Sequence, residues 1–202
     1  GTVRYIEECA VQAGLETNFI FLEDIGIDEN GYFTDLDDKR IETLFKLYPW
    51  EWNMKDEFGL SLPKSELKII EPAWRIILSN KGMLPLLWEM FSGHPNLLPA
   101  FFPNDPRVSE IEGGVVKKPL FSREGGNVEI TEVDGSIIKA DGPYGDQGSI
   151  IQALHPLPVF DGNHTVIGSW LVASNACGIG IREDDTAITR DTSRFLPHVI
   201  LD

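Results

Sequence analysis

Cysteine is scarce in this sequence of 202 residues, which contains only Cys9 and Cys177. The two lie far apart and neither belongs to a C-x-x-C pair, so the sequence offers no zinc-binding or thiol-redox motif. So few cysteines are typical of proteins in a reducing cytosol, and a cytoplasmic location is expected. We predict that each cysteine is a small buried residue and not a nucleophile.

Long apolar runs are also missing. No stretch approaches the length of apolar sequence that a transmembrane helix needs, and no secretory signal opens the chain. The sequence therefore predicts no membrane span. It begins at Gly1 and Thr2 without an initiator methionine and passes directly into a helix-like pattern, which suggests a processed or truncated piece of a longer protein.

Basic residues are outnumbered, with 17 lysines and arginines against 32 aspartates and glutamates and a formal net charge of -15. A protein whose main task is to bind nucleic acid needs a basic face, so this class is not expected. The summed negative field is compatible with a cationic substrate such as a polyamine. The alternative is that the surplus carboxylates only keep the protein soluble.

Signatures of hydrolases and of metal sites are absent as well. No Ser-His-Asp order and no nucleophile elbow occurs. The acidic run at 35–38 is interpreted as a solvated loop. No metal site is predicted in this chain, and none of the histidines shows metal-ligand spacing: His94, His155, His164 and His198.

What is present describes an ordinary folded protein, with 42% hydrophobic and 10% aromatic residues. We divide it into residues 1–68, a small α/β subdomain expected on the substrate side, and residues 69–202. The first part is predicted to contain a helix over 3–13, a buried strand over 17–22, a hairpin turn at 28–31, a strand over 41–48 and a helix from Trp50. A connector is expected over 63–68.

The second part is predicted to hold one strong helix beside mainly antiparallel strands. The helix covers 83–90, with Pro85 in its first turn and Ser79 or Asn80 as the cap. Lys81 precedes it, where a cation is unfavourable with the helix dipole unless an anion is also bound. The strands are expected at 115–118, 128–132, 136–140, 149–154 and 166–173, with a turn around Arg182.

The central stretch of the sequence runs from residue 115 to residue 127. Its two valines favour a strand, which should end or lie at a sheet edge at Pro119, because proline cannot donate to a sheet ladder. Gly125 and Gly126 allow a tight turn whose exposed amides suit an anion, and Lys118 adds a point charge. A polyphosphate is the natural ligand, although the order of a Walker A motif is absent. A plain β-hairpin with a flexible tip is the alternative.

Taken together and in order, these segments resemble the glutathionylspermidine synthase family, a group of ATP-grasp carbon–nitrogen ligases. Several motifs in a fixed order along nearly the whole chain are more specific than any one glycine loop. The resemblance implies an ATP-grasp fold of the α/β (α+β) class, with a mainly antiparallel sheet and flanking helices, incomplete at its N-terminal side. Residues 69–202 are expected to be its nucleotide-binding portion. The matching segments are 46–52, 71–74, 79–88, 116–119, 122–127, 152–154 and 178–185.

The resemblance also implies roles for individual residues. Lys81 and Lys118 are expected to contact the nucleotide phosphates from two sides. A mobile loop containing Ser122, Gly125 and Gly126 is expected to close over these phosphates. The strand of Gln152, Ala153 and Leu154 is expected to offer backbone groups to the adenine edge. Arg182 is expected to be catalytic, because it would steady the negative charge of the transferring phosphoryl group.

The implied activity is that of an ATP-dependent carboxylate–amine ligase that works through an acyl phosphate. ATP and Mg²⁺ would be the cofactors, and the substrates would be a peptide or glutathione-like acid and an amine or polyamine. The family's metal ligands are expected upstream of this chain, since the acidic residues 183–185 are interpreted as a turn with salt links. We therefore expect the isolated chain to bind nucleotide weakly and not to turn over. A non-catalytic nucleotide-binding or regulatory module and a small-molecule kinase are the alternatives.

Overall fold

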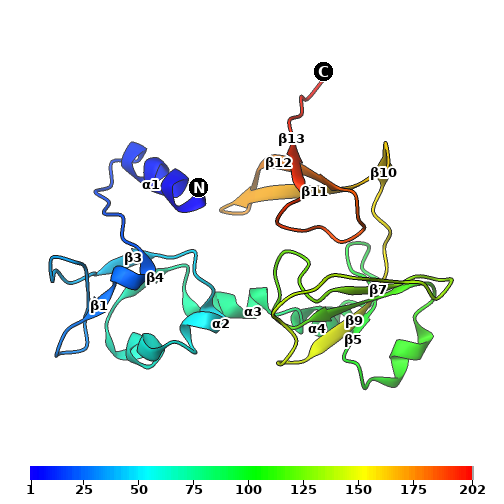
Figure 1. Ribbon diagram of the computed structural model, residues 1–202, viewed down its shortest axis with the longest axis horizontal. Coiled ribbons are helices and arrows are strands. Elements are labelled where there is room, and N and C mark those ends of the chain that lie inside the picture. Colours follow the sequence, from blue (N-terminus) through cyan, green and yellow to red (C-terminus); the bar gives the residue numbers. More distant parts are fainter. Residues whose placement is uncertain (202) are drawn as a thin grey trace. The chain divides into compact units, whose positions relative to one another are not determined.

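The computed structural model describes residues 1–201 and divides the chain into two compact units. The first is Gly1–Leu78 and the second begins at Ser79 (Figure 1). The boundary between the two compact units, after Leu78, thus lies ten residues later in the chain than the domain boundary expected after residue 68. Pairing of β3 with β4 (Lys68–Ile70), and a hydrogen bond of 3.2 Å from Trp50 Nε1 to the carbonyl of Glu71, tie the residues after 68 to the first unit.

The first unit combines short strands with helical turns. The predicted Asn-Gly turn joins β1 to β2 in a hairpin. In this turn the Asp28 carboxylate accepts hydrogen bonds from the N–H groups of Asn30 and Tyr32. The strand expected over 41–48 is shorter, and its parallel pairing with β4 was not foreseen. The elements are α1 (Thr2–Gln12), β1 (Gly26–Ile27), β2 (Phe33–Thr34), β3 (Thr43–Phe45), α2 (Trp50–Asn53) and α3 (Ile76–Ser79), with 3-10 turns at Leu22–Asp24, Glu57–Lys64 and Ala73–Arg75.

Two predictions for this unit are wrong. Residues 17–22 do not form a buried strand: Phe21 is 58% exposed, and its ring meets that of Phe19 edge-on at 5.0 Å. An apolar run becomes a strand only where a partner strand lies beside it, and none pairs with these residues within 1–201. The connector expected over 63–68 belongs instead to a 3-10 turn and to the start of β4.

The second unit contains the predicted helix, α4 (Met83–Met90), and a five-stranded antiparallel sheet in the order β5-β9-β6-β7-β8. Pro119 is the last residue of β6, as its missing N–H predicts. The Asp-Gly turn at 134–135 joins β7 to β8. The strands are β5 (Ala100–Phe101), β6 (Val115–Pro119), β7 (Glu129–Thr131), β8 (Ile137–Lys139) and β9 (Ser149–Ala153), and a 3-10 turn covers Pro106–Glu110.

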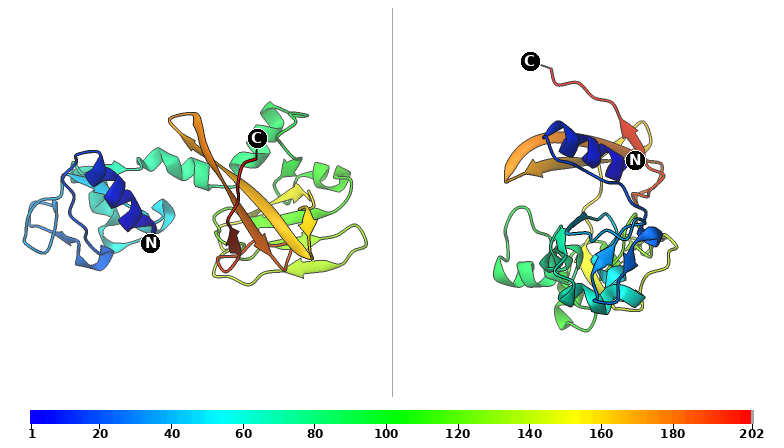
Figure 2. Two further views of the ribbon diagram at one scale, coloured as in Figure 1. Left: turned by 90° about the horizontal axis from the view of Figure 1, so that it is seen from above. Right: turned by 90° about the vertical axis from the view of Figure 1, so that its left-hand side faces the viewer.

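A second antiparallel sheet, in the order β10-β11-β12-β13, completes this unit. It lies above the five-stranded sheet, and its long β11–β12 hairpin reaches past it (Figure 1, Figure 2). A bulge between Trp170 and Leu171 interrupts the hairpin near its tip. The strands are β10 (Val159–Phe160), β11 (Asn163–Val172), β12 (Asn175–Asp184) and β13 (Arg194–Leu196).

The core of the second unit lies where the two sheets meet. Val116 of β6 and Ile130 of β7 form one buried cluster with Ile188, which comes from the segment between β12 and β13. The described chain is therefore a mixed α+β structure with mostly antiparallel sheets, as expected. Neither cysteine is buried, contrary to the prediction. None of the helices within residues 1–201 has the length and apolar character that crossing a bilayer requires.

Candidate functional site

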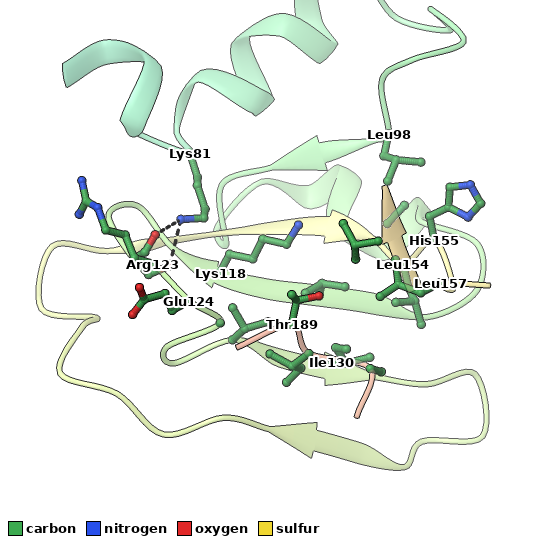
Figure 3. Close-up of a pocket in the computed structure, with 18 residues that line it drawn as sticks. Lys81, Leu98, Lys118, Arg123, Glu124, Ile130, Leu154, His155, Leu157 and Thr189 are labelled. Carbon is green, nitrogen blue, oxygen red and sulfur yellow. Dashed lines mark hydrogen bonds between the residues drawn. The ribbon is translucent and has the colours of Figure 1, made fainter. Parts of the chain in front are cut away.

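A cleft of about 340 Å³ opens in the second unit, on the face of the five-stranded sheet that carries Val116 and Lys118 (Figure 3). One end is polar and contains Lys81, Arg123 and Glu124. The other end is mainly apolar and also carries His155. Its lining residues come from both sheets and from the loops around them: Leu98, Val116, Ile130, Leu154, Leu157, Val166 and Ile188.

Lys118 projects into the cleft because of the alternation along β6. Val116 and Lys118 are two residues apart and share one face, whereas Lys117 lies on the other face and is exposed. The Lys118 Nζ atom donates a hydrogen bond of 2.8 Å to Oε1 of Gln152. Burial lowers the pKa of the Lys118 ammonium below its usual value, because the charged form loses hydration.

Lys81 reaches the same cleft from the segment before α4. Its N–H donates to the carbonyl of Leu120 at 2.8 Å, which fixes the backbone beside the end of β6. Its Nζ atom donates to the carbonyl oxygen of Ser122 at 2.8 Å and to Oγ at 2.9 Å. The side chains of Lys81 and Lys118 extend into a common space, as Figure 3 shows. The sequence-predicted pair of lysines is therefore brought together.

The prediction that Ser79 or Asn80 caps α4 is wrong, because no side chain accepts a hydrogen bond at the N-cap position of this helix. Oδ1 of Asn80 accepts the N–H of Gly82 at 2.8 Å, and Gly82 occupies the N-cap position. This short turn orients the residue between them, Lys81, toward the cleft.

The loop after β6 is held in place by its glycines. Gly125 has φ +74°, and a Cβ there would lie 2.6 Å from Cγ2 of Ile188 and 2.7 Å from the carbonyl oxygen of Thr189. A Cβ on Gly126 would lie 2.9 Å from the ring of Tyr144. Both glycines are thus required by packing. Ser122 and Gly125 line the cleft, whereas Gly126 supports the loop from outside it.

Sequence reasoning missed Arg123. It lies between Ser122 and Gly125 in the same loop, and the structure places it at the polar end of the cleft beside Lys81 (Figure 3). A cation inside a loop that is already suspected of binding phosphate was the available signal. The lining cations now come from three places: the segment before α4, strand β6 and the loop after it.

The predicted adenine-side strand is only partly available to a ligand. Ala153 and Leu154 line the cleft, but Gln152 is buried and bound to Lys118. The N–H of Ala153 donates to the carbonyl of Pro99 and the N–H of Leu154 to that of Gly114, each at 2.8 Å. These two amides are committed to the sheet, so a base edge would have to pair with other backbone groups.

Arg182 lies within β12 and not in a turn, so its predicted local structure is wrong. It is directly opposite Val166 of β11, which lines the cleft, and opposite Phe195 of β13, whose ring centre is 5.2 Å from the guanidinium carbon. One guanidinium nitrogen donates to the carbonyl of Arg190. The Nε atom is buried and has no hydrogen-bond partner among the described residues.

The acidic residues after Arg182 form ion pairs, as expected. Arg190 donates to Asp184 at 2.7 Å and to Asp185 at 2.8 Å, and Ser193 also donates to Asp184. These bonds, led by that of Arg190, hold the pKa of the Asp184 carboxyl well below its usual range. Arg194 binds Glu183 at 3.0 Å. Within residues 1–201, no group of three or more acidic, histidine or cysteine side chains is placed to hold a metal ion.

Comparison with known proteins decides the family. Residues 1–201 match the family model described as glutathionylspermidine synthase preATP-grasp. The chain belongs to the glutathionylspermidine synthase family. The model describes a preATP-grasp domain, so the finer assignment of residues 69–202 to the nucleotide-binding portion remains a prediction.

Relatives with curated names are similar along nearly the whole chain. A candidate acid–amine ligase of Haemophilus influenzae is 43% identical over 98% of this chain and 52% of its own length. The trypanothione synthetase of Crithidia fasciculata is 28% identical over 96% of this chain and 33% of its own length. The bifunctional glutathionylspermidine synthetase/amidase of Escherichia coli is 25% identical over 98% and 36%. The chain thus spans about half, or less, of the length of the relatives that it matches.

Proposed function

We propose that this chain supplies the phosphate-binding part of an ATP-dependent carboxylate–amine ligase. The observation that carries the proposal is that Lys81, Lys118 and Arg123 all line one cleft, whose other end is mainly apolar. A nucleotide has the same division, with a charged triphosphate and a flat, largely apolar base. The names of the relatives support a ligase, since the matched proteins include a glutathionylspermidine synthetase and a trypanothione synthetase.

The electrostatics of Lys118 favour an anionic ligand. Its ammonium is largely withdrawn from water and its hydrogen-bond partner, Gln152, is neutral, so the charge is not compensated by that contact. A phosphate oxygen would take the place of the lost water molecules as a hydrogen-bond acceptor and would stabilise the charged form of Lys118. Phosphoryl transfer depends mainly on positioning and charge neutralisation, which is what a set of converging cations provides.

In the proposed reaction, the carboxylate of the acid substrate attacks the terminal phosphoryl group of ATP, forming an acyl phosphate and releasing ADP. The amine then attacks the acyl carbon, phosphate leaves, and an amide forms. Lys81, Lys118 and Arg123 hold the phosphates. Arg182 is not among the residues that line the cleft, so its proposed role of stabilising charge on the transferring group rests on the family resemblance alone. The acid would be a peptide or glutathione-like molecule and the amine a polyamine or similar amine.

Magnesium, when bound, neutralises phosphate charge in this chemistry. The carboxylate best placed by burial, Asp184, is already bound by Arg190, Ser193 and Thr186, so these residues do not fit a metal site. We therefore assign no step to magnesium through this chain and expect its ligands in another part of the protein.

Nucleotide binding by this chain tests the proposal. Lys118→Ala should weaken ATP affinity at least tenfold in calorimetry with and without magnesium, because it removes a cation inside the cleft. Lys117→Ala is the matched control, since it removes the neighbouring charge from the opposite face of β6 and should change affinity less than twofold. Equal effects of the two substitutions, or none of Lys118→Ala, would exclude the cleft as the phosphate site.

The non-catalytic nucleotide-binding or regulatory module remains the second candidate. It is favoured by one observation, that the described residues contain no group placed to hold a metal ion. The two are separated by an assay of ADP release by the complete protein with an acid and an amine present. Release that requires both substrates supports the ligase, and no release supports the module.

A further inference from the structure

Residues 185–193, between β12 and β13, form part of the cleft wall although they lie in neither a helix nor a strand. We call them the wall segment. Ala187, Ile188 and Thr189 line the cleft, and Ile188 is 5% exposed and belongs to the buried cluster. Because no ladder of backbone hydrogen bonds fixes such a segment, other groups have to hold it in place.

One carboxylate, that of Asp184, holds both ends of the wall segment. Near its start, Asp184 accepts a hydrogen bond from the N–H of Thr186 at 3.1 Å. Near its end, Asp184 accepts hydrogen bonds from the Arg190 guanidinium at 2.7 Å and from the hydroxyl of Ser193. Asp184 is 4% exposed, and hydrogen bonds to a buried charge are among the stronger ones in a protein. The carboxylate therefore closes the segment into a loop whose middle lines the cleft.

Two further sets of contacts fix the backbone on either side of that middle. The hydroxyl of Thr186 donates to the carbonyl of Ile188 at 2.9 Å. The N–H of Arg190 donates to Oγ of Ser193 at 2.7 Å, and the carbonyl of Arg190 accepts from the guanidinium of Arg182. The cleft-lining residues are thus held from both directions along the chain.

The loop that contains Arg123 rests directly on the wall segment. We call this loop, residues 122–127, the phosphate loop. A Cβ on Gly125 would lie 2.6 Å from Cγ2 of Ile188 and 2.7 Å from the carbonyl oxygen of Thr189, so the two backbones are in close contact. Close-packed contacts of this kind transmit displacements, and a shift of Thr189 would therefore move the phosphate loop.

We propose that Asp184 and Arg190 are positioning residues for the nucleotide. Neither lines the cleft. Their ion pair sets the place of Thr189, and Thr189 in turn sets the place of Gly125 and of the phosphate loop. They act through the wall segment and do not touch the ligand. The inference rests on the proposed function, which supplies the identity of the ligand.

The neighbouring ion pair provides a matched control. Glu183 is adjacent to Asp184 in β12 and points to the opposite face, where Arg194 of β13 binds it at 3.0 Å. Arg190→Ala and Arg194→Ala each remove an arginine that is paired with a carboxylate of β12. Each also changes the net charge by one, so the long-range field that acts on an anionic ligand changes equally. Of these two arginines, only Arg190 belongs to the wall segment.

Calorimetry with ADP on the full chain tests the positioning role, at a temperature well below the unfolding midpoint of each variant. Arg190→Ala should weaken ADP binding at least tenfold, and Arg194→Ala should change it less than twofold. Arg190→Lys keeps the charge near Asp184 and should restore the affinity to within threefold. Equal effects of the two alanine variants would overturn the inference. A lower unfolding midpoint of Arg190→Ala with unchanged ADP affinity would also overturn it, because the role would then be stability alone.

Hydrogen exchange of the chain without nucleotide tests the coupling itself. Arg190→Ala should speed exchange of the backbone amides at 122–127, which the Arg190 side chain does not contact, and Arg194→Ala should leave these rates unchanged. Faster exchange that is confined to the wall segment would show that the segment does not position the phosphate loop.

A second variant covers the case in which Arg190→Ala does not fold. Thr186→Val retains the ion pair and removes only the hydroxyl that donates to the carbonyl of Ile188. It should weaken ADP binding at least threefold and speed exchange at 122–127. No change in either measurement would overturn the inference.

The measurements separate this inference from the proposed function. If ADP binds the unmodified chain and both alanine variants equally well, the positioning role is wrong and the proposed function stands. If ADP does not bind the unmodified chain, the proposed function fails. The exchange measurement needs no nucleotide, so it still decides whether the ion pair positions the loop.

Discussion

The two sheets of the second unit differ in how much of their own surface they bury. The five-stranded sheet contains residues that are closed off from solvent, such as Ala100 and Ile150, each 0% exposed. The four-stranded sheet buries little along its long hairpin, where Ile167 is 66% exposed and Trp170 projects into solvent. We therefore expect the five-stranded sheet to contribute more to the stability of the unit than the long hairpin of the second sheet does. The cleft lies where the two meet, so it combines a rigid base with an accessible edge.

The largest expected effect tests this division directly. Ile150→Ala should lower the free energy of unfolding by about 3–4 kcal/mol, because it leaves a cavity in a fully buried place. Ile167→Ala is the same chemical change in the hairpin and should cost no more than about 0.5 kcal/mol. Unfolding of both variants by denaturant would measure their free energies of unfolding. Similar losses would show that the hairpin is as important to stability as the five-stranded sheet.

A smaller effect is expected where the four-stranded sheet is anchored. Asp184→Asn should cost roughly 2–3 kcal/mol at pH 7, since it breaks an ion pair in which the carboxylate is buried and Arg190 is partly exposed. The pKa of Asp184 is lower in the folded than in the unfolded protein. Its stabilisation is therefore present above about pH 4 and is lost as the pH falls below that value.

Unfolding of the wild type and of Asp184→Asn across pH 2–7 provides the measurement, and the two should converge at the acid end. Asp185→Asn is the control, because Asp185 is 74% exposed and pairs with the same arginine. It should change stability by no more than about 0.5 kcal/mol. A gap between wild type and Asp184→Asn that persists unchanged at low pH would contradict the proposed role of the carboxylate.

The smallest effect compares glycines. Gly125→Ala should cost about 1–2 kcal/mol, because φ is positive and the new methyl group would meet Ile188 and Thr189. Gly168→Ala in the hairpin should be neutral or slightly stabilising, since open space lies around it. Thermal unfolding compares the two. A loss of stability in Gly168→Ala equal to that in Gly125→Ala would mean that the hairpin glycine is structural after all.

Sequence reasoning succeeded where the signal was local. The Asn-Gly turn, the stop at Pro119 and the helix with Pro85 in its first turn each depend on the conformational preferences of a few residues. Sequence reasoning failed where the local structure depends on which strands pair with each other. The apolar run 17–22 has the composition of a strand but pairs with none of the described strands. The parallel pairing of β3 with β4 could not be read from either segment alone.

The candidate site shows the same limit. Lys81 and Lys118 were predicted as a pair, and the structure brings both to one cleft. Arg123 was missed, although it lies in the predicted phosphate loop and lines the same cleft. Arg182 was predicted in a turn, yet the ladder with β11 and β13 extends through it. Cys9 was expected to be buried, but α1 contains no buried residue.

The neutral partner of Lys118 has a consequence for how a nucleotide would arrive. The molecule as a whole has a net charge of -15, so an anion that is still distant is repelled. At the end of its path it meets an ammonium that an amide, and not a carboxylate, holds in position. Dissolved salt screens the distant repulsion over about 8 Å at physiological strength and affects the close contact much less. An acidic protein of this kind can therefore admit an acidic ligand more readily in salt than in pure water.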